Sequence, residues 1–280
     1  MRLIKQSFEI WDQQEGLEGV YKQIERAGRV CYKSEDKITE TSAKDFVERM
    51  IKSGHGAMLE HGTIYLYLPP YSSITFHKYR DNKYSKYKEV RETEVSSPKI
   101  HKYVTTNLRV LVENEWLDDL QYLCEPIEFH EKRTTVRFLC DRGVSHEFVR
   151  HRVFSFAQES TRYCNYSKSK FNNECTFIIP SWCTYPEGCY LPINSLQYGS
   201  YIWSLRQSEE AYFELLHNGW IAQQARAVLP NALKTELVMT GFISDWKHFF
   251  QLRCNKTAHP DARILAEPLQ EEFYNKNILK

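Results

Sequence analysis

The sequence of 280 residues has no long apolar run, no block of like charges and no glycine-rich phosphate loop. No apolar stretch approaches the roughly 20 residues that a membrane-spanning helix needs. With 37 Lys and Arg against 36 Asp and Glu, the net charge is +1. The molecule as a whole therefore has no electrostatic reason to bind nucleic acid or an anionic membrane. Any site for an anion must be a local cluster of cations.

The sequence also has no closely spaced pair of cysteines. The eight cysteines are scattered and none forms a C-x-x-C pair, which argues against a disulfide framework. The first ten residues contain no apolar run of the kind found in a signal peptide. We therefore expect a cytoplasmic protein with free thiols. The cysteines are Cys31, Cys124, Cys140, Cys164, Cys175, Cys183, Cys189 and Cys254.

Two known catalytic motifs are only partly matched, because the spacing or the context of the residues differs. His146 and His151 are five residues apart, whereas a zinc-protease helix places two histidines four apart on one face, so we expect no metal site. Neither Ser155 nor Ser160 lies in a G-x-S-x-G turn, so neither is expected to be a nucleophile. Because no G-x-G-x-x-G or Walker loop occurs, Arg and Ser side chains would have to hold any nucleotide.

Apolar periodicity predicts both helices and strands. The expected strands are residues 1–10, 63–68, 134–140 and 176–180. The expected helices are 17–30, a segment from a Thr41 cap to Gly54, 107–123, a short helix that Ser145 caps and that runs into Arg150, 195–228 as one helix or a broken pair, 245–253 and 260–274. Residues 71–104 show no clear period and are expected to form a surface excursion. A loop carrying Pro186 and Pro192 is expected before the long helix, and residues 233–240 are apolar but short.

The stretch from Arg150 to Tyr163 contains three arginines, a histidine and two serines between large apolar residues. A solvated charged face would not carry Val153, Phe154 and Phe156 between its cations, and guanidiniums are rarely buried unless they are paired. Arginine is the side chain best suited to bidentate recognition of phosphate or carboxylate. The pattern favours a half-buried segment whose arginines bind an anion. An amphipathic segment with internal salt bridges is the alternative.

Two further arginines occupy unusual contexts. Arg226 lies on the last turn of the expected long helix. Arg253 follows a strongly apolar helix, where a lone cation would be costly without a partner. Structural salt bridges explain both equally well. His55 and His61 flank a turn in which histidines are usually structural, and Cys254 shows no sign of activation as a nucleophile.

Taken together, four ordered motifs resemble those of the flavin-dependent thymidylate synthases. The family's R-H-R signature, followed after seven residues by Ser, is matched by Arg150-His151-Arg152 and Ser160, and the match continues as S-x-R-Y to Tyr163. The other segments are Gly54-His55 with Glu60-His61, which resembles G-H-x-x-x-x-E-H, Ala225-Arg226 with Leu229-Pro230, which resembles A-R-x-x-L-P, and Phe250-Gln251-Leu252-Arg253, which resembles F-L-x-L-R. The resemblance extends from about Val20 to Phe273.

The resemblance implies an α+β fold with a mostly antiparallel twisted sheet and packed helices. It implies one domain over residues 1–280, with a helical insertion at about 69–132. It also implies a homotetramer with active sites shared between subunits, which binds FAD and methylates dUMP to dTMP. The carbon donor would be 5,10-methylenetetrahydrofolate and the reductant NADPH, and neither nucleic acid nor a membrane is an expected partner.

Residue by residue, the resemblance implies that Arg253 lies against the uracil edge and favours the base deprotonated at N3, with no enzyme nucleophile. A guanidinium suits this role because it stabilises negative charge and keeps its own proton. The residues implied to hold FAD are His55, Arg150, His151, Arg152, Gln158 and His248. Those implied to contact dUMP are Glu147, Arg150, Gln158, Glu159, Ser160, Thr161, Arg162, Arg226 and Arg253, with Ser160, Arg162 and Arg226 on its phosphate and sugar.

Six positions depart from the family's pattern. They are Glu147 for Gln, Gln158 for Glu, Ala57 for Ser or Thr, Phe242 for Asn, Ser244 for Arg and His248 for Asn. Because the first two exchanges leave the local carboxylate count similar, they indicate a variant site and not an inactive one. The last three weaken the flavin contacts expected from this segment, although His248 can still form hydrogen bonds.

Two other functions are compatible with parts of the sequence. Aromatic residues beside Arg clusters are typical of proteins that bind single-stranded nucleic acid, but the near-zero net charge counts against this class. A family member that keeps the fold and binds flavin or dUMP without turnover is the other alternative.

Overall fold

The computed structural model describes residues 1–70, 77–92, 99–183 and 198–279. Three sheets are found within these ranges. The central sheet is antiparallel, in the order β2 (Ser7–Trp11), β6 (Arg133–Asp141), β9 (Lys234–Phe242) and β7 (Ser155–Gln158). A second antiparallel sheet has the order β3 (Thr63–Leu68), β5 (Lys99–Asn107) and β4 (Lys86–Glu92), and β1 (Arg2–Ile4) pairs in parallel with β8 (Thr176–Ile178). The expected mostly antiparallel α+β fold is confirmed.

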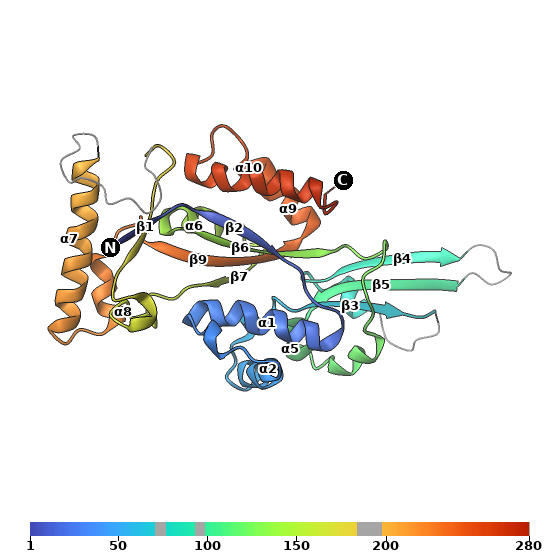
Figure 1. Ribbon diagram of the computed structural model, residues 1–280. Helices are drawn as coiled ribbons and strands as arrows, with labels where there is room; N and C mark the ends of the chain where they lie inside the picture. The colour runs from blue at the N-terminus through green and yellow to red at the C-terminus, as the bar shows by residue number, and fades with distance from the viewer. Residues whose placement is uncertain (71–76, 93–98, 184–197, 280) are drawn as a thin grey trace.

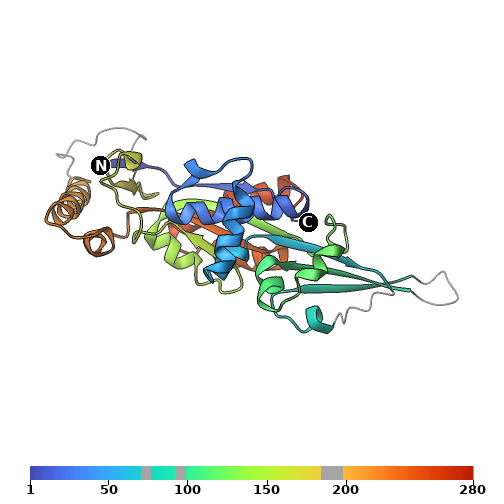
Figure 2. The same cartoon turned by 90° about the horizontal axis from the view of Figure 1, so that it is seen from below.

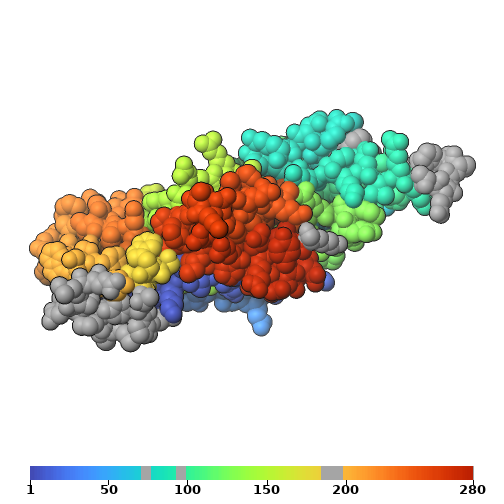
Figure 3. All heavy atoms as spheres, turned by 90° about the horizontal axis from the view of Figure 1, so that it is seen from above, coloured from blue at the N-terminus to red at the C-terminus, as the bar shows by residue number. Residues whose placement is uncertain are grey.

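The central sheet lies between two layers of helices (Figure 1). One layer contains α9 (Ile243–Arg253), α10 (Pro260–Asn275) and the short α6 (Arg142–Phe148). Figure 3 shows α9 and α10, in red, over the centre of this face. The other layer is α1 (Gly16–Tyr32), against which α2 (Ser42–Lys52) packs, as the view from below shows (Figure 2). None of the helices in the described ranges is both long and apolar enough to cross a bilayer.

Alternation along the strands of the central sheet decides which side chain enters which layer. On the α9 side, Phe138 and Leu237 are fully buried against Trp246 and Phe249. On the α1 side, Val238 packs with other buried apolar residues of α1 and β2. Full burial of a Phe or Leu side chain contributes roughly 1.5–3 kcal/mol, so this period-two pattern fixes the register of the sheet.

The second sheet extends away from the helical layers (Figure 1). Ile64, Leu66 and Leu68 of β3 are fully buried, as their alternation predicts. The short helices beside it are α3 (Gly56–Leu59), α4 (His77–Arg80), α5 (Leu108–Glu113) and the 3-10 helix η2 (Leu117–Tyr122). Residues 71–104 were expected to form a surface excursion without a clear period, and their described part contains α4, β4 and most of β5. Residues 71–76 and 93–98 lie outside the described ranges.

The described part of the region 69–132 is therefore less helical than expected, because β4 and most of β5 lie in it. The helix predicted over 107–123 is also wrong in extent. It ends at Glu113, and Glu115 has a left-handed φ of 61°, which breaks the chain before η2 begins at Leu117. No glycine marks this break in the sequence.

The third group of helices packs around β8. It consists of α7 (Gly199–His217), α8 (Ala222–Ala225) and the 3-10 helix η4 (Arg226–Val228), with Gly219 at a φ of 88° between the first two. The alternative of a broken pair is thus confirmed, and Arg226 lies in a 3-10 turn and not in a long helix. The expected loop with Pro186 and Pro192 lies outside the described residues. Two more 3-10 helices are η1 (Glu35–Lys37) and η3 (Ser169–Phe171).

Both predicted hydroxyl caps are wrong. Thr41 stands at the N-cap position of α2 but its side chain forms no capping hydrogen bond. Asp141, and not Ser145, caps α6, because its Oδ1 accepts a hydrogen bond from the backbone N–H of Val144 at 2.6 Å. Ser145 lies inside the helix, where its hydroxyl donates to the carbonyl of Arg142 at 2.8 Å.

Candidate functional site

The predicted site residues gather at the two ends of β7. Residues 147–154 precede this strand, and the turn that begins at Ser160 follows it. Four residues of extended strand span roughly 10 Å at about 3.3 Å per residue. Within one chain the predicted residues therefore form two clusters and not one pocket.

The first cluster, the Arg253 cluster, consists of Glu147, His151 and Arg253. Arg253 is the last residue of α9, and its side chain is 12% exposed. Its Nε donates to Nε2 of His151 at 2.9 Å. Its two terminal nitrogens donate to Oε2 of Glu147 at 2.8 Å and to the Glu147 carbonyl at 2.5 Å. Three of the five guanidinium N–H donors are used in these bonds, so one on each terminal nitrogen is left for a ligand.

His151 serves Arg253 as a neutral acceptor. Burial and the neighbouring Arg253 and His248 lower the pKa of His151 to about 4. At neutral pH the imidazole can therefore accept the hydrogen bond from Arg253 at Nε2. Its ring also packs against Phe249, with 5.0 Å between centroids. The hydrogen bond from Arg253 lowers the pKa of the Glu147 carboxyl, so that Glu147 balances the charge of the guanidinium.

The two arginines beside His151 point away from it. Arg150 is 72% exposed on its side chain, and its contact with Glu147 is 3.5 Å long. Arg152 is exposed as well, whereas His151 is 7% exposed. Consecutive residues of this triplet thus reach different surroundings. His146 is exposed while His151 is bonded to Arg253, so the two do not face a common ligand.

The second cluster begins at the Ser160 turn, which we define as residues 160–164. The carbonyl of Ser160 accepts hydrogen bonds from the N–H groups of Tyr163 and Cys164 at 3.1 and 2.9 Å. These two bonds fold residues 160–164 into a turn. The N–H of Arg162 donates to Ser160 Oγ at 3.3 Å, and its exposed guanidinium lies 5.4 Å from the ring centre of Tyr163.

Arg226 joins the Ser160 turn from η4. Its guanidinium is exposed and donates to Thr161 Oγ1 at 3.1 Å. The predicted phosphate ligands Ser160, Arg162 and Arg226 thus lie on or beside one turn. The structure brings these three predicted residues together, and it places Arg253 and His151 at the other end of β7.

Gln158 and Glu159 point into the protein. Gln158 faces the α9 side of the sheet, where its amide donates to Ser145 Oγ at 2.9 Å and to Thr235 Oγ1 at 3.2 Å. Glu159 faces the α1 side and is 2% exposed. Its carboxylate accepts from Lys234 Nζ at 2.7 Å. Their predicted contacts with ligands remain predictions, and both side chains are already engaged within the chain.

The remaining predicted flavin ligands are exposed. His55 stands at the N-cap position of α3, and His248 is exposed on α9, with its ring centre 6.3 Å from that of His151. Phe242 is 7% exposed and packs under the guanidinium of Arg133 at 5.5 Å. Ser244 bonds to Glu131 through both its N–H and its hydroxyl. Phe242 and Ser244 therefore have contacts within the chain, as do two other departures, Glu147 and Gln158.

Sequence reasoning missed the charged residues of the sheet. Lys234, Glu236 and Arg137 face α1 and form ion pairs there, and Arg133 reaches the carbonyl of Glu60 at 2.9 Å. The one available signal was that Lys234 and Glu236, two residues apart, directly precede the apolar residues of β9. A charged residue at an inward position predicts a buried partner but does not identify it.

The chain was compared with known protein families and with curated proteins. The family model described as thymidylate synthase complementing protein matches residues 17–107 and 125–276. A curated relative from Pyrococcus furiosus, named flavin-dependent thymidylate synthase, is 29% identical over 141 residues, which cover 50% of this chain and 54% of the relative. The chain thus spans about half the length of that relative. A protein of the same name from Corynebacterium aurimucosum is 24% identical over 265 residues, which cover 91% of this chain and 76% of the relative.

A solved structure also shows a likeness. It is a UMP/dUMP methylase from Streptomyces cacaoi bound with 5-Br dUMP, at 16% identity and a TM-score of 0.44, covering 98% of this chain and 93% of that chain.

Proposed function

Because the chain belongs to the thymidylate synthase complementing protein family, we propose that it is a flavin-dependent thymidylate synthase that converts dUMP to dTMP in the cytoplasm. The carbon donor would be 5,10-methylenetetrahydrofolate and the reductant NADPH. The donated carbon would bond to C5 of the uracil, its bonds to the two folate nitrogens would break, and C5 would lose its proton. Bound FAD would carry the hydride equivalent from NADPH that completes the methyl group.

The observation that carries this proposal is the state of Arg253. Its guanidinium is oriented by His151 and Glu147, and each terminal nitrogen retains one N–H. Guanidinium N–H donors suit a planar anionic group with adjacent acceptors. A uracil deprotonated at N3 presents such an edge. Arg253 would thereby stabilise the negative charge that makes C5 nucleophilic, which is why no enzyme nucleophile is required.

The residues at the surface around His151 fit FAD. Its diphosphate needs cations that are not already neutralised, and Arg150 and Arg152 are both exposed. His55 and His248 are exposed and could form hydrogen bonds with the ring system. Phe242 and Ser244 are engaged with Arg133 and Glu131, so we assign them no flavin contact. His151 itself would act on Arg253 and would meet the flavin only at its edge.

The Ser160 turn fits the nucleotide phosphate. Arg162 and Arg226 are exposed cations, and the hydroxyls of Ser160 and Thr161 lie beside them. Two guanidiniums with nearby hydroxyls can bind a phosphate through several charge-assisted hydrogen bonds. The Arg253 cluster would hold the base and the Ser160 turn the phosphate.

We further propose that complete sites form between subunits of a homotetramer. The two clusters lie at opposite ends of β7, and each contains groups for only part of the nucleotide and flavin. If the Ser160 turn of one subunit faced the Arg253 cluster of another, the two together would form a complete site. Size-exclusion chromatography with light scattering tests this assembly, and a monomer that is fully active would contradict it.

The enzyme proposal is tested by the visible absorption spectrum of the purified protein. Under anaerobic conditions, the bands of bound FAD should bleach on addition of NADPH, and dUMP should change the rate. Addition of methylenetetrahydrofolate should then yield dTMP. Protein that takes up no FAD would overturn the proposal, and bleaching without dTMP would indicate a member that binds its ligands without turnover.

A further inference from the structure

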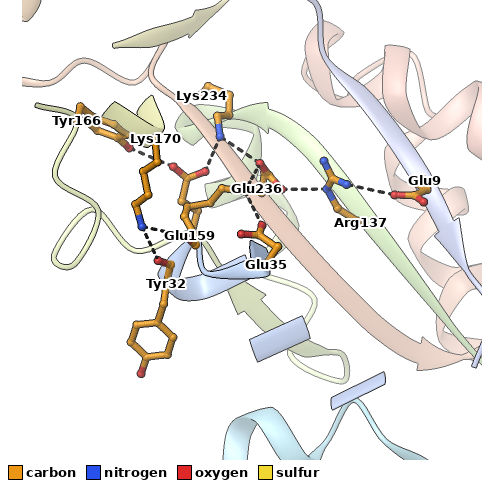
Figure 4. Close-up of polar contacts among 10 residues, drawn as sticks. Glu9, Tyr32, Glu35, Arg137, Glu159, Tyr166, Lys170, Lys234 and Glu236 are labelled. Atoms are coloured by element: carbon orange, nitrogen blue, oxygen red, sulfur yellow. Dashed lines mark hydrogen bonds and ion pairs between the residues drawn. The ribbon is translucent and has the colours of Figure 1, made fainter. Parts of the chain in front are cut away.

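A row of alternating charges crosses the α1 face of the central sheet. We define the ion-pair row as Glu9, Arg137, Glu236, Lys234 and Glu159, which come from β2, β6, β9 and the end of β7 (Figure 4). Figure 4 shows these side chains in a continuous chain of contacts, with Tyr166 and Lys170 at one end.

The contacts in the row are short. Arg137 donates a hydrogen bond to Glu9 at 3.2 Å and forms an ion pair with Glu236 at 3.0 Å. Lys234 lies 3.2 Å from Glu236 and 2.7 Å from Glu159. One end of the row is exposed and the other is buried, since the side chain of Glu9 is 49% exposed and that of Glu159 is 1% exposed.

The row also fixes the end of α1. Lys33, which ends this helix with a left-handed φ of 47°, contacts Glu236 at 2.9 Å and Glu35 at 2.6 Å. One carboxylate, Glu236, therefore receives cations from three elements. Burial raises its pKa, but Lys234, Lys33 and Arg137 outweigh burial and lower the pKa of Glu236 to about 2.

Glu159 stands where the chain leaves the sheet. Its N–H still donates to the carbonyl of Glu236 at 2.8 Å, which extends the β7–β9 ladder by one residue. The next N–H, that of Ser160, donates instead to the carbonyl of Cys31 on α1 at 3.0 Å. The backbone thus changes its partner from β9 to α1 between these two residues, and the Ser160 turn begins there.

The far end of the turn returns to the same carboxylate. The Tyr166 hydroxyl donates to Glu159 Oε1 at 3.4 Å, and Lys170 donates to the carbonyl of Lys33 at 2.8 Å. Tyr163 within the turn packs on Tyr32, with 5.2 Å between ring centres. Glu159 therefore contacts the chain on both sides of the Ser160 turn, and Lys234 is the cation that holds Glu159.

We propose that Lys234 is a positioning residue: by pairing with Glu159, it fixes the path of the Ser160 turn and so places Ser160 and Arg162 for the phosphate of the nucleotide. The ligand assignment in this statement rests on the proposed function. Glu159 accordingly acts through the turn and does not itself contact the substrate. A buried carboxylate that loses its cation must move toward water or take up a proton, and either change releases the turn.

The test compares four variants of the full-length protein. Lys234→Met removes the charge and keeps the length of the side chain, and Lys234→Arg keeps the charge. Glu159→Gln keeps the shape of the carboxylate without its charge. Glu9→Gln is the matched control, because it removes ion pairs from the exposed end of the same row, remote from the turn. Each is examined by hydrogen–deuterium exchange without ligand and by titration with dUMP in the flavin-bound state.

Lys234→Met and Glu159→Gln should speed exchange in the peptide that contains residues 159–166. They should weaken dUMP binding at least about 10-fold, equivalent to about 1.4 kcal/mol, while kcat at saturating dUMP changes less. Lys234→Arg should restore both properties, and Glu9→Gln should leave both within about twofold of the unaltered protein. If Lys234→Met does not fold, Glu159→Gln and Lys234→Arg decide the result.

Unchanged exchange and dUMP affinity in the folded variants would overturn the positioning role. Equal effects of Glu9→Gln and Glu159→Gln would also overturn it, because the row would then act only on overall stability. If the unaltered protein binds no dUMP, the proposed function fails, and the exchange rates alone decide whether Lys234 positions the turn.

Discussion

Arg253 donates a hydrogen bond from Nε to Nε2 of His151 across 2.9 Å, so a guanidinium is oriented by a neutral imidazole. A carboxylate in that place would neutralise the cation, whereas the imidazole fixes its direction and leaves its charge. Glu147 supplies the carboxylate from the side, where it contacts one terminal nitrogen. His151 and Glu147 thus both orient Arg253, and only Glu147 brings a negative charge.

Replacement of Arg253 by Ala should abolish turnover and leave the spectrum of bound flavin unchanged. Loss of a preorganised donor to developing negative charge lowers kcat by roughly 10²–10³-fold. The measurement is dTMP formation under saturating substrates, with flavin content determined by absorbance. Arg263→Ala is the control, since Arg263 is an arginine on α10 paired with Glu267 at 3.6 Å. Near-normal turnover without Arg253 would contradict its role.

Replacement of Arg226 by Ala should weaken dUMP binding. A lost hydrogen bond to a charged group costs about 1.5–3 kcal/mol, so the dissociation constant should rise at least tenfold. Thr161→Val removes the hydroxyl that Arg226 contacts but leaves the cation in place, and should have the smaller effect. Isothermal titration with dUMP measures both. Unchanged affinity in Arg226→Ala would remove this residue from the phosphate site.

Stability should fall as the pH is lowered from 6.5 toward 4.5, in part because of His61. Burial and Arg133 lower the pKa of His61 to about 3 in the folded protein, from an ordinary value of 6.5. In this window the unfolded chain binds a proton that the folded chain excludes. Each such histidine lowers the free energy of unfolding by about 1.4 kcal/mol per pH unit.

The contribution of His61 can be isolated with His61→Gln. Urea unfolding at several pH values should show a slope that is shallower by about 1.4 kcal/mol per pH unit, with His151 still contributing. The Nδ1 of His61 lies 2.8 Å from Thr240 Oγ1, and Gln can form a hydrogen bond there. An identical slope in both proteins would show that His61 is exposed or already charged in the folded state.

Replacement of Gly241 by Ala should destabilise the protein. A Cβ at this position of β9 would meet the ring of Phe154 at 2.5 Å, so the ring or the strand must shift. Overpacking of this kind costs about 1–3 kcal/mol. The midpoint of urea unfolding measures the loss, and the double variant Gly241→Ala with Phe154→Leu should recover part of it. If the two substitutions lowered the stability additively, the added methyl group would not clash with Phe154.

Elements with strong local patterns could be predicted from the sequence. The strand Thr63–Leu68 was predicted with its observed bounds, and Trp246, Phe249 and Phe250 of α9 are buried as their spacing indicated. β9 was recognised only as a short apolar segment. Its first inward residues, Lys234 and Glu236, interrupt the apolar face, and their partners come from other strands and from α1. Such partners cannot be found from local spacing.

The site, too, was only partly predictable from the sequence. The motifs identified the residues, but the contacts between them depend on the fold, since Arg253 and His151 are 102 positions apart. The choice of Asp141 over Ser145 as the cap of α6 also depended on where β6 ends. Only Ser145 was predicted as the cap, and local spacing did not identify Asp141.

The length of β7, four residues, limits which insertions and deletions this protein can accept. Strand side chains alternate faces, and each added residue lengthens the strand by about 3.3 Å. One insertion in β7 would turn Glu159 from the α1 face to the α9 face and move the Ser160 turn away from Cys31. A substitution in β7 changes one side chain, whereas an insertion or a deletion shifts every residue that follows it relative to the two faces of the sheet. The number of residues from His151 to Ser160 is thus constrained independently of their identities.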